Sequence, residues 1–170
     1  GIETLAKYAR MFGLGETSGI EITEAEPEIS DEYAVQSAIG QGTNNYTVSQ
    51  LCRYVSAVAN RGTVYDLSLI DKTTASDGTL IKDYGSETVS QMSEISFETW
   101  DLVQSGMEQM VSASSTFDGI DFSMAGKTGT AQQSEIHPDH TLFVGYAPTD
   151  NPEIAVAVRI VNGYSSSYAA

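Results

Sequence analysis

Ala125-Gly126-Lys127-Thr128-Gly129-Thr130 is the densest motif of this 170-residue sequence. It lies inside the strand-like segment 124–132, so the lysine is predicted to stand on a strand. A lysine there supplies positive charge for a ligand carboxylate and assists proton transfer. Gly129 has no side chain, which lets an extended ligand lie against the backbone. The nearby hydroxyl and N–H groups can donate hydrogen bonds to a developing oxyanion. The alternative is a surface strand that carries no chemistry.

A nucleotide-binding P-loop is a competing interpretation, because Gly126-Lys127-Thr128 matches the end of its pattern. That pattern requires a glycine at position 121, which is Asp121 here. It also requires a helix after Thr128, where the sequence stays strand-like. Both requirements fail, so the sequence excludes a P-loop.

Two further strand-like segments follow the motif, at 141–147 and 154–161. Residues 155–158 form a continuous apolar run, which predicts a strand covered on both faces. Helical patterns dominate the chain before residue 115. Helices followed by an antiparallel-looking sheet predict an α+β fold.

The first half of the sequence carries clear helix signals. Apolar residues at helical spacing predict a helix over 5–12 that ends at Gly13. Thr47 is a favourable N-cap for a second helix that ends at Gly62. Between these helices, alternation predicts a short strand over 20–23, and the acidic stretch 24–28 reads as a solvated loop.

The middle of the sequence combines a hairpin with a third helix. Ser76-Asp77-Gly78 is a turn signal between two β-like runs within 64–84. Ser96 can cap a helix that reaches Val111, whose methionine and aromatic stripe predicts core packing. Cys52, the single cysteine, lies on the apolar stripe of the preceding helix and is interpreted as a core residue.

The charge of the chain excludes several classes of partner. With 8 basic and 23 acidic residues, the formal net charge is −15. Nucleic-acid binding needs a basic face, and an anionic membrane surface repels such a chain. No apolar run reaches the length of about 18 residues that a membrane span needs. His137 and His140 are separated by Pro138 and Asp139, and the proline disfavours a helix that would present both histidines on one face. Since no third ligand is evident, the sequence does not predict a metal site here.

Lys-Thr-Gly on a strand resembles the third motif of active-site serine penicillin-recognising enzymes. Other stretches resemble class B penicillin-binding proteins, in the family's order: 5–15 with Ser18-Gly19-Ile20, 38–42 followed by 47–51, 58–62, 106–111, 140–148 and 152–156. The resemblance covers nearly the whole chain. It implies a serine β-lactamase-like fold and a D,D-transpeptidase that cross-links peptidoglycan stem peptides through a serine ester and is acylated by β-lactams.

The resemblance also implies roles for the motif residues. Lys127 is the electrostatic partner of the active-site hydroxyls, and Thr128 and Thr130 hold the carboxylate of the substrate or antibiotic. Gly129 belongs to the same binding strand, and the Thr130 N–H forms half of the oxyanion hole. No cofactor or metal is implied. The implied location of the parent protein is the extracytoplasmic face of the bacterial cell membrane, with a membrane anchor.

Two family motifs are missing from the sequence. S-x-x-K is absent, because Thr4, Leu69, Thr79 and Met124 stand three residues before the four lysines. S-x-N is absent as well. We therefore expect residues 1–170 to be the C-terminal portion of a single transpeptidase domain, inactive alone. Its helical part is expected at about 1–115 and its sheet at about 122–162, with Ser165-Ser166-Ser167 in a loop before a missing closing helix.

Two other functions stay open at this point. One is a β-lactam sensor or binding domain, which shares the Lys-Thr-Gly strand without cross-linking peptides. The other is a non-catalytic scaffold of the same fold. The strand from Ile154 to Val161 has Arg159 as its only charge, so its unpaired edge predicts self-association.

Overall fold

The structure is a computed structural model that describes residues 1–133 and 136–164. The helices are α1 (Ile2–Met11), α2 (Ala34–Ala38), α3 (Val48–Ala59) and α4 (Phe97–Ser112), with a 3-10 turn η1 (Ser115–Phe117). The strands are β1 (Thr63–Tyr65), β2 (Lys72–Thr74), β3 (Leu80–Asp83), β4 (Thr88–Gln91), β5 (Ala125–Ala131), β6 (His140–Ala147) and β7 (Ile154–Ile160). The predicted run Ser165-Ser166-Ser167 lies outside the described residues.

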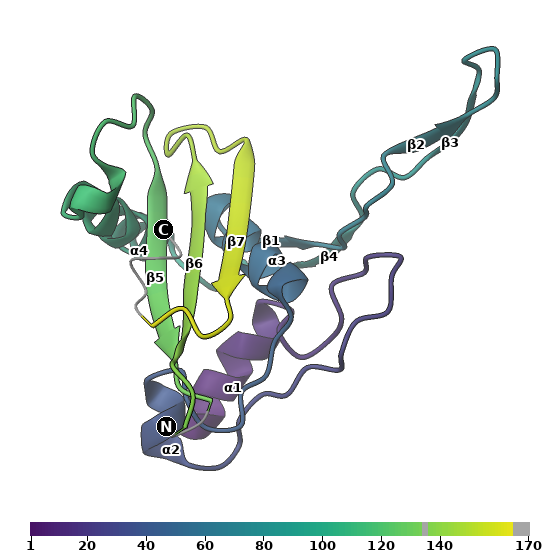
Figure 1. The fold of residues 1–170 in the computed structure, drawn as a ribbon. Helices are drawn as coiled ribbons and strands as arrows, with labels where there is room; N and C mark the ends of the chain where they lie inside the picture. The colour runs from purple at the N-terminus through teal and green to yellow at the C-terminus, as the bar shows by residue number, and fades with distance from the viewer. Residues whose placement is uncertain (134–135, 165–170) are drawn as a thin grey trace.

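The main sheet has the order β5-β6-β7, and both pairs of strands are antiparallel. Helices α3 and α4 lie behind this sheet in Figure 1 and pack on one of its faces. We call that face the helix side and the opposite face the far side. Val55 and Val58 of α3 form a buried cluster with Ala125 and Tyr146 of the sheet. This arrangement confirms the predicted α+β class and the three predicted strands.

Helix α3 begins where the sequence predicted. The Thr47 hydroxyl accepts a hydrogen bond from Gln50 N, and the Gln50 side chain accepts one from Thr47 N, which makes a capping box. Arg53, on the same helix, is 1% exposed. Its guanidinium donates to Gly13 O at the end of α1 and to Asp66 Oδ1 after β1, the latter at 3.4 Å. Helix α3 is therefore linked to the end of α1 and to the segment after β1 through the buried Arg53 guanidinium, whose charge is paired with Asp66.

Helix α4 confirms its predicted start, but its apolar stripe is only partly buried. Ser96 accepts from Thr99 N as the N-cap, and Trp100 is buried. The Gln104 amide donates to Val58 O and Ala59 O at 2.9 and 3.1 Å, so it satisfies carbonyls at the end of α3. Phe97 is 72% exposed, which makes the prediction of core packing wrong at that position.

The segment 16–30 departs from the sequence prediction. Residues 20–23 form no strand. The Leu67 N–H donates to Ser18 O, and the Glu21 carboxylate accepts from Ser68 Oγ and Leu69 N. Further along the segment, Glu28 forms an isolated antiparallel bridge with Asn45, so the segment is fastened by separate contacts and not by a continuous ladder. Alternation over four residues predicts a strand only where a partner strand is available.

The helical part of the chain also contains short strands. Strands β1 and β4 pair antiparallel, although no pattern in the sequence predicted this pairing. Strands β2 and β3 form the hairpin predicted around Ser76-Asp77-Gly78, with Ala75 N donating to Thr79 O at 2.8 Å. This hairpin projects from the body of the molecule (Figure 1), and most of its side chains are exposed.

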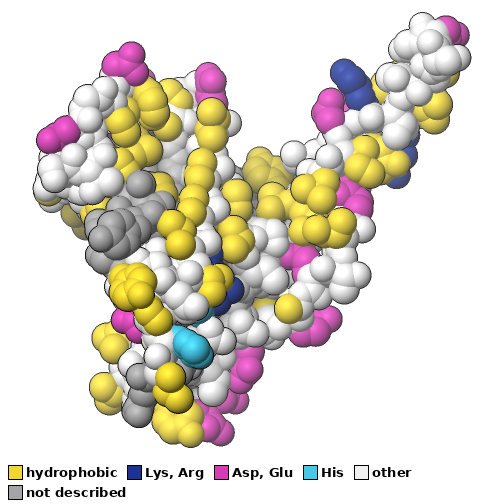
Figure 2. Space-filling view, viewed as in Figure 1, with side chains coloured by type: hydrophobic (Ala, Val, Ile, Leu, Met, Phe, Trp, Pro, Cys, Tyr) yellow, Lys and Arg dark blue, Asp and Glu magenta, His cyan; other side chains and the backbone are white. Residues whose placement is uncertain are grey.

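The far side of β7 is uncovered among the described residues. Ile154 is 64% exposed and Val156 is 41% exposed. Figure 2 shows hydrophobic side chains aligned over this part of the sheet. The prediction of a strand covered on both faces is therefore wrong for β7 in this structure. Within the described part of the chain, no helix is long and apolar enough to cross a membrane.

Candidate active site

The predicted motif occupies strand β5, which is an outer strand of the main sheet. Lys127 lies opposite Val144 and Gly129 opposite Leu142, while Thr128 lies opposite Phe143. Side chains alternate along a strand, so Lys127 and Gly129 share the helix side with Ala125. The side chains of Thr128 and Thr130 belong to the far side. The four predicted site residues therefore lie on one edge strand, two on each face of the sheet.

Two glycines of the sheet are required by packing and not by ligand binding. Gly126 and Gly145 lie opposite each other. A Cβ at Gly126 would be 2.6 Å from the Phe143 ring, and one at Gly145 would be 2.8 Å from Ala125 O. The Phe143 ring fills this space on the far side, where it also packs against Phe117 with centroids 5.6 Å apart.

Gly129 is different, because a Cβ there would meet only Leu142 Cβ, at 3.7 Å, and Leu142 Cδ1, at 4.0 Å. That is an ordinary van der Waals contact. Packing between β5 and β6 therefore tolerates a side chain at this position. Because Gly129 has no side chain, the helix side of β5 has open space beside Lys127.

The outer edge of β5 presents backbone groups of alternate residues. In an antiparallel ladder the N–H and C=O of one residue point to the same side, and the next residue points to the other. Lys127 Nζ donates to Thr128 O at 2.8 Å, and the side-chain amide of Gln41 meets Gln132 N and O at 3.2 and 3.3 Å. Thr130 lies between Thr128 and Gln132, so its N–H and C=O also point outward. Within the described residues, nothing is hydrogen-bonded to them.

The end of β5 is held by residues to which the sequence assigned other roles or none. His140 is buried at the start of β6, one residue before the predicted strand segment 141–147. Its Nδ1 accepts from Asn162 N at 3.0 Å, and its Nε2 is hydrogen-bonded to Gln133 Oε1. The histidine therefore ties the chain after β5 to the chain after β7. Gln41 lies in the quoted stretch 38–42, but a side-chain contact across the fold has no local signal.

Glu24 corrects the prediction of a solvated acidic loop. Its carboxylate accepts from Ser18 N at 2.6 Å, from Thr47 Oγ1 at 3.0 Å and from Ser49 Oγ. Burial opposes ionisation of this carboxyl, but the hydrogen bonds from Ser49, Ser18 and Thr47 outweigh it and lower its pKa. The carboxylate also stands at the N-terminus of α3, where negative charge is favoured. Glu24 thus fastens the loop 16–24 to the helix.

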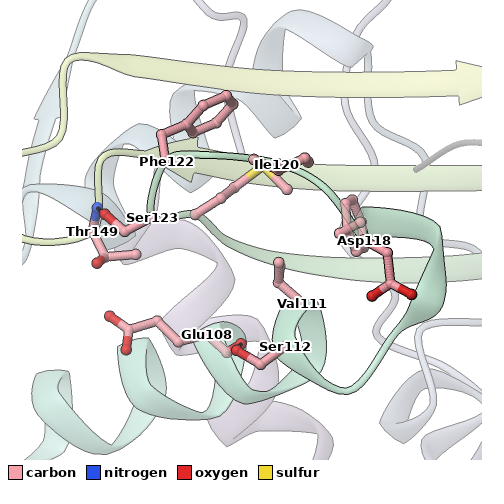
Figure 3. Close-up of a pocket in the computed structure, with 10 residues that line it drawn as sticks. Glu108, Val111, Ser112, Asp118, Ile120, Phe122, Ser123 and Thr149 are labelled. Atoms are coloured by element: carbon pink, nitrogen blue, oxygen red, sulfur yellow. Dashed lines mark hydrogen bonds between the residues drawn. The ribbon is translucent and has the colours of Figure 1, made fainter.

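Two hollows of the surface lie apart from the motif. One of about 250 Å³ lies between α4, the segment after η1 and the β6–β7 turn (Figure 3), with Glu108, Asp118 and Thr149 around it. The other, of about 430 Å³, is lined by aromatic residues of α1, α3 and α4. Neither contains a residue from Lys127 to Thr130. The candidate site is therefore a strand edge that neither of these two hollows reaches.

Burial also shifts the pKa of groups that do not belong to this edge, among them Tyr146 and Cys52. Burial raises the pKa of Tyr146 to about 12, with a smaller contribution from the negative charge of Glu108. Burial also raises the pKa of the Cys52 thiol, whose Sγ lies 3.7 Å from Ala155 O on β7. Cys52 is thus a partly buried packing residue, as predicted, and poorly suited to act as a nucleophile.

Comparison with known proteins gives one consistent result. The family description "Penicillin binding protein transpeptidase domain" matches residues 1–170. The chain is 27% identical to Peptidoglycan D,D-transpeptidase MrdA of Haemophilus influenzae, over 100% of this chain and 31% of that protein. It is 29% identical to Penicillin-binding protein 2B of Streptococcus pneumoniae, over 99% of this chain and 28% of that protein.

Solved structures agree with the sequence comparison. PBP2 of Pseudomonas aeruginosa in complex with WCK 5153 matches with a TM-score of 0.81 and 30% identity, over 98% of this chain and 41% of that one. The penicillin G acyl-enzyme complex of penicillin-binding protein A from Mycobacterium tuberculosis shares the fold, with a TM-score of 0.84, 24% identity and coverage of 100% and 41%. The chain spans about a quarter to a third of the length of the curated relatives it matches. It belongs to the penicillin-binding protein transpeptidase domain family, and its relatives are of the class B type.

Proposed function

We propose that this chain forms one wall of the active site of a D,D-transpeptidase, which cross-links peptidoglycan stem peptides by serine acyl transfer. The observation that carries the proposal is the outer edge of β5. There the N–H and C=O of Thr130 point away from β6, between the Lys127 ammonium and the Gln41 amide. An edge of this kind accepts an extended peptide or a β-lactam by backbone pairing.

Each motif residue has a role in this proposal. The Thr130 N–H is one donor to the oxyanion that forms when the serine attacks the carbonyl carbon of the substrate. Lys127 supplies positive charge beside the reacting hydroxyls, and its exposed side chain is accessible to a ligand at this edge. The hydroxyls of Thr128 and Thr130 donate to the ligand carboxylate. Gly129 leaves room for the ligand on the helix side.

The nucleophile of this reaction lies outside residues 1–170 in our proposal, because the sequence has no serine three residues before a lysine. Residues 1–170 are then the C-terminal portion of one transpeptidase domain, and they have no acyl-transfer activity alone. The parent protein acts on the extracytoplasmic face of the membrane, where peptidoglycan is assembled, and it is membrane-anchored. Its partners are stem peptides and β-lactams. The relatives named as transpeptidases and the acyl-enzyme complexes of the structural neighbours support this reading.

Peptide mapping tests the proposal. The full-length protein that contains these residues is incubated with a β-lactam, digested and analysed by mass spectrometry. We expect one adduct on a serine outside residues 1–170, followed by lysine at the third position after it. The isolated 170-residue chain should take up none. An adduct on any serine of this chain would show that the nucleophile assignment is wrong.

A β-lactam sensor remains the alternative function for the same strand. The two functions separate in one assay with the full-length protein and a stem-peptide donor and acceptor. A transpeptidase releases the terminal D-amino acid and forms the cross-link. A sensor forms the β-lactam adduct and no cross-link.

We also propose that the 170-residue chain self-associates through β7. This strand has no partner on its outer side among the described residues, and Ile154 and Val156 expose apolar surface beside that edge. Unpaired strand edges with apolar side chains add further strands readily. Val156→Lys places a charge beside this edge and should suppress the association.

A further inference from the structure

Gln41 stands at the end of the β5 edge as if it were a residue of a neighbouring strand. In the amide orientation that satisfies both groups, its nitrogen donates to Gln132 O at 3.3 Å and its oxygen accepts from Gln132 N at 3.2 Å. Two residues of paired antiparallel strands exchange hydrogen bonds in this same reciprocal way. One side chain therefore completes the outer backbone pairing of β5 at Gln132.

The loop that carries Gln41 is built to hold it in place. The buried hydroxyls of Ser30 and Ser37 are 2.7 Å apart beneath it. Gly42, with φ +84°, passes over them, and a Cβ there would lie 2.7 Å from each hydroxyl oxygen. The backbone of Gln41 is fixed as well, since its N–H donates to Gln36 O at 2.9 Å and its C=O accepts from Asn44 Nδ2 at 2.9 Å. The side chain therefore reaches β5 from a fixed backbone.

The position of the contact relates it to the proposed site. Gln132 is two residues after Thr130 on the same edge, so it is the next residue whose N–H and C=O point outward. Gln41 occupies that pair, and Lys127 Nζ occupies Thr128 O at the other end. The Thr130 N–H and C=O are the last open backbone groups of the edge before the pair that Gln41 occupies. A ligand that pairs with β5 at Thr130 therefore cannot extend its pairing to Gln132 while Gln41 stays in place.

We propose that Gln41 is a positioning residue for the oxyanion-binding N–H of Thr130. By holding Gln132, it fixes the direction of the β5 edge at Thr130 and ends the ligand-binding stretch there. The inference rests on the proposed function, because it presupposes that the Thr130 N–H faces the reacting carbonyl. It touches no substrate in this role, so Gln41 acts through the strand.

Acylation kinetics of the full-length protein with a β-lactam test the inference. Gln41→Met keeps the side-chain length and loses both hydrogen bonds. We expect the first-order rate constant of acylation to fall about fivefold, with the dissociation constant of the non-covalent complex within about twofold. Loss of a side chain that only supports the fold would not lower the acylation rate constant while it leaves the dissociation constant nearly unchanged. Gln36→Met is the matched control, since Gln36 is exposed in the same segment and should change neither constant.

Hydrogen exchange at the Gln132 amide tests the contact independently of activity. We expect this amide to be protected in the wild-type protein and to lose that protection in Gln41→Met. An unchanged exchange rate would overturn the inference, whatever the kinetics show. Lys127→Ala, measured in parallel, separates the two proposals. If Lys127→Ala slows acylation and Gln41→Met does not, the role of Gln41 is wrong and the proposed function stands. If Lys127→Ala has no effect, the proposed function fails.

Discussion

The two outer strands of the sheet, β5 and β7, pair with the same central strand but present opposite surfaces. Strand β5 carries small and polar residues, and its outer backbone groups meet Lys127 Nζ, the Gln41 amide or nothing. Strand β7 carries apolar side chains, with Ile154 and Val156 substantially exposed on the far side. A polar edge with uncovered backbone N–H and C=O groups can pair with a small ligand. An apolar strand edge instead favours contact with another protein surface. The comparison gives a chemical reason for the two proposals, in which β5 is the ligand-binding edge and β7 the self-association edge.

The largest effect is expected from a change that disturbs both edges through β6. A Cβ at Gly145 would lie 2.8 Å from Ala125 O, so Gly145→Val should destabilise the fold by about 3 kcal/mol. The melting temperature of the full-length protein should fall by roughly 5–10 °C. Gly129→Ala is the matched control, with a cost below about 1 kcal/mol. Equal losses in the two variants would contradict the assignment of Gly145 to packing and Gly129 to the ligand edge.

The next largest effect separates the chemistry of β5 from its stability. Lys127→Ala should slow β-lactam acylation of the full-length protein by at least about tenfold, which corresponds to ~1.4 kcal/mol. Its melting temperature should barely change, because an exposed lysine on a strand contributes little to folding. Lys72→Ala, on the projecting hairpin, controls for the loss of one exposed charge. A normal acylation rate in Lys127→Ala would show that Lys127 is an ordinary surface residue with no role in acylation.

Strand β7 should respond in association and not in acylation. Light scattering of the 170-residue chain across a concentration series should show self-association that Val156→Lys suppresses. A lysine there places a charge beside the unpaired edge, which disfavours strand addition. Val89→Lys is a close control, since Val89 is 40% exposed and Val156 is 41% exposed. If the chain stays monomeric at high concentration, with or without the substitution, the proposal of self-association through β7 is wrong.

The last effect concerns the packing of β7 on α3. Because burial raises the pKa of Cys52, less thiolate is present at neutral pH, and the thiol is partly covered. Alkylation by iodoacetamide should be at least about tenfold slower than in the urea-unfolded chain at the same pH. The rate should rise with pH up to the shifted pKa. Rapid alkylation of the folded chain would mean that β7 does not pack on α3 in solution.

The sequence predicted those parts of the fold that depend on local signals. Thr47 and Ser96 cap the helices they were expected to cap, because an N-cap hydrogen bond spans three residues. The three strands of the main sheet were also predicted. The strand over 20–23 was wrong, since alternation carries no information about a partner strand. Phe97 was wrong because the stripe on α4 is wider than the surface that packs against it.

The candidate site was predicted only as far as its motif extends. Lys127 and Thr130 could be named from sequence, together with the strand that holds them. The reciprocal contact between Gln41 and Gln132 joins positions that are distant in sequence, and Glu24 meets Ser49 in the same way. Such pairings arise from tertiary packing. An isolated glutamine or glutamate in a polar stretch gives no signal of them.

A crystal structure of the full-length protein acylated by a β-lactam tests the ligand-binding edge most directly. We expect the carbonyl oxygen of the acyl group to lie within about 3.1 Å of Thr130 N, with the ligand amide facing Thr130 O. The ligand carboxylate should lie beside Lys127 and Thr128, and Gln41 should still cover Gln132. An acyl carbonyl oxygen more than about 4 Å from Thr130 N, with the ligand elsewhere on the sheet, would contradict the assignment of β5 as the ligand-binding edge.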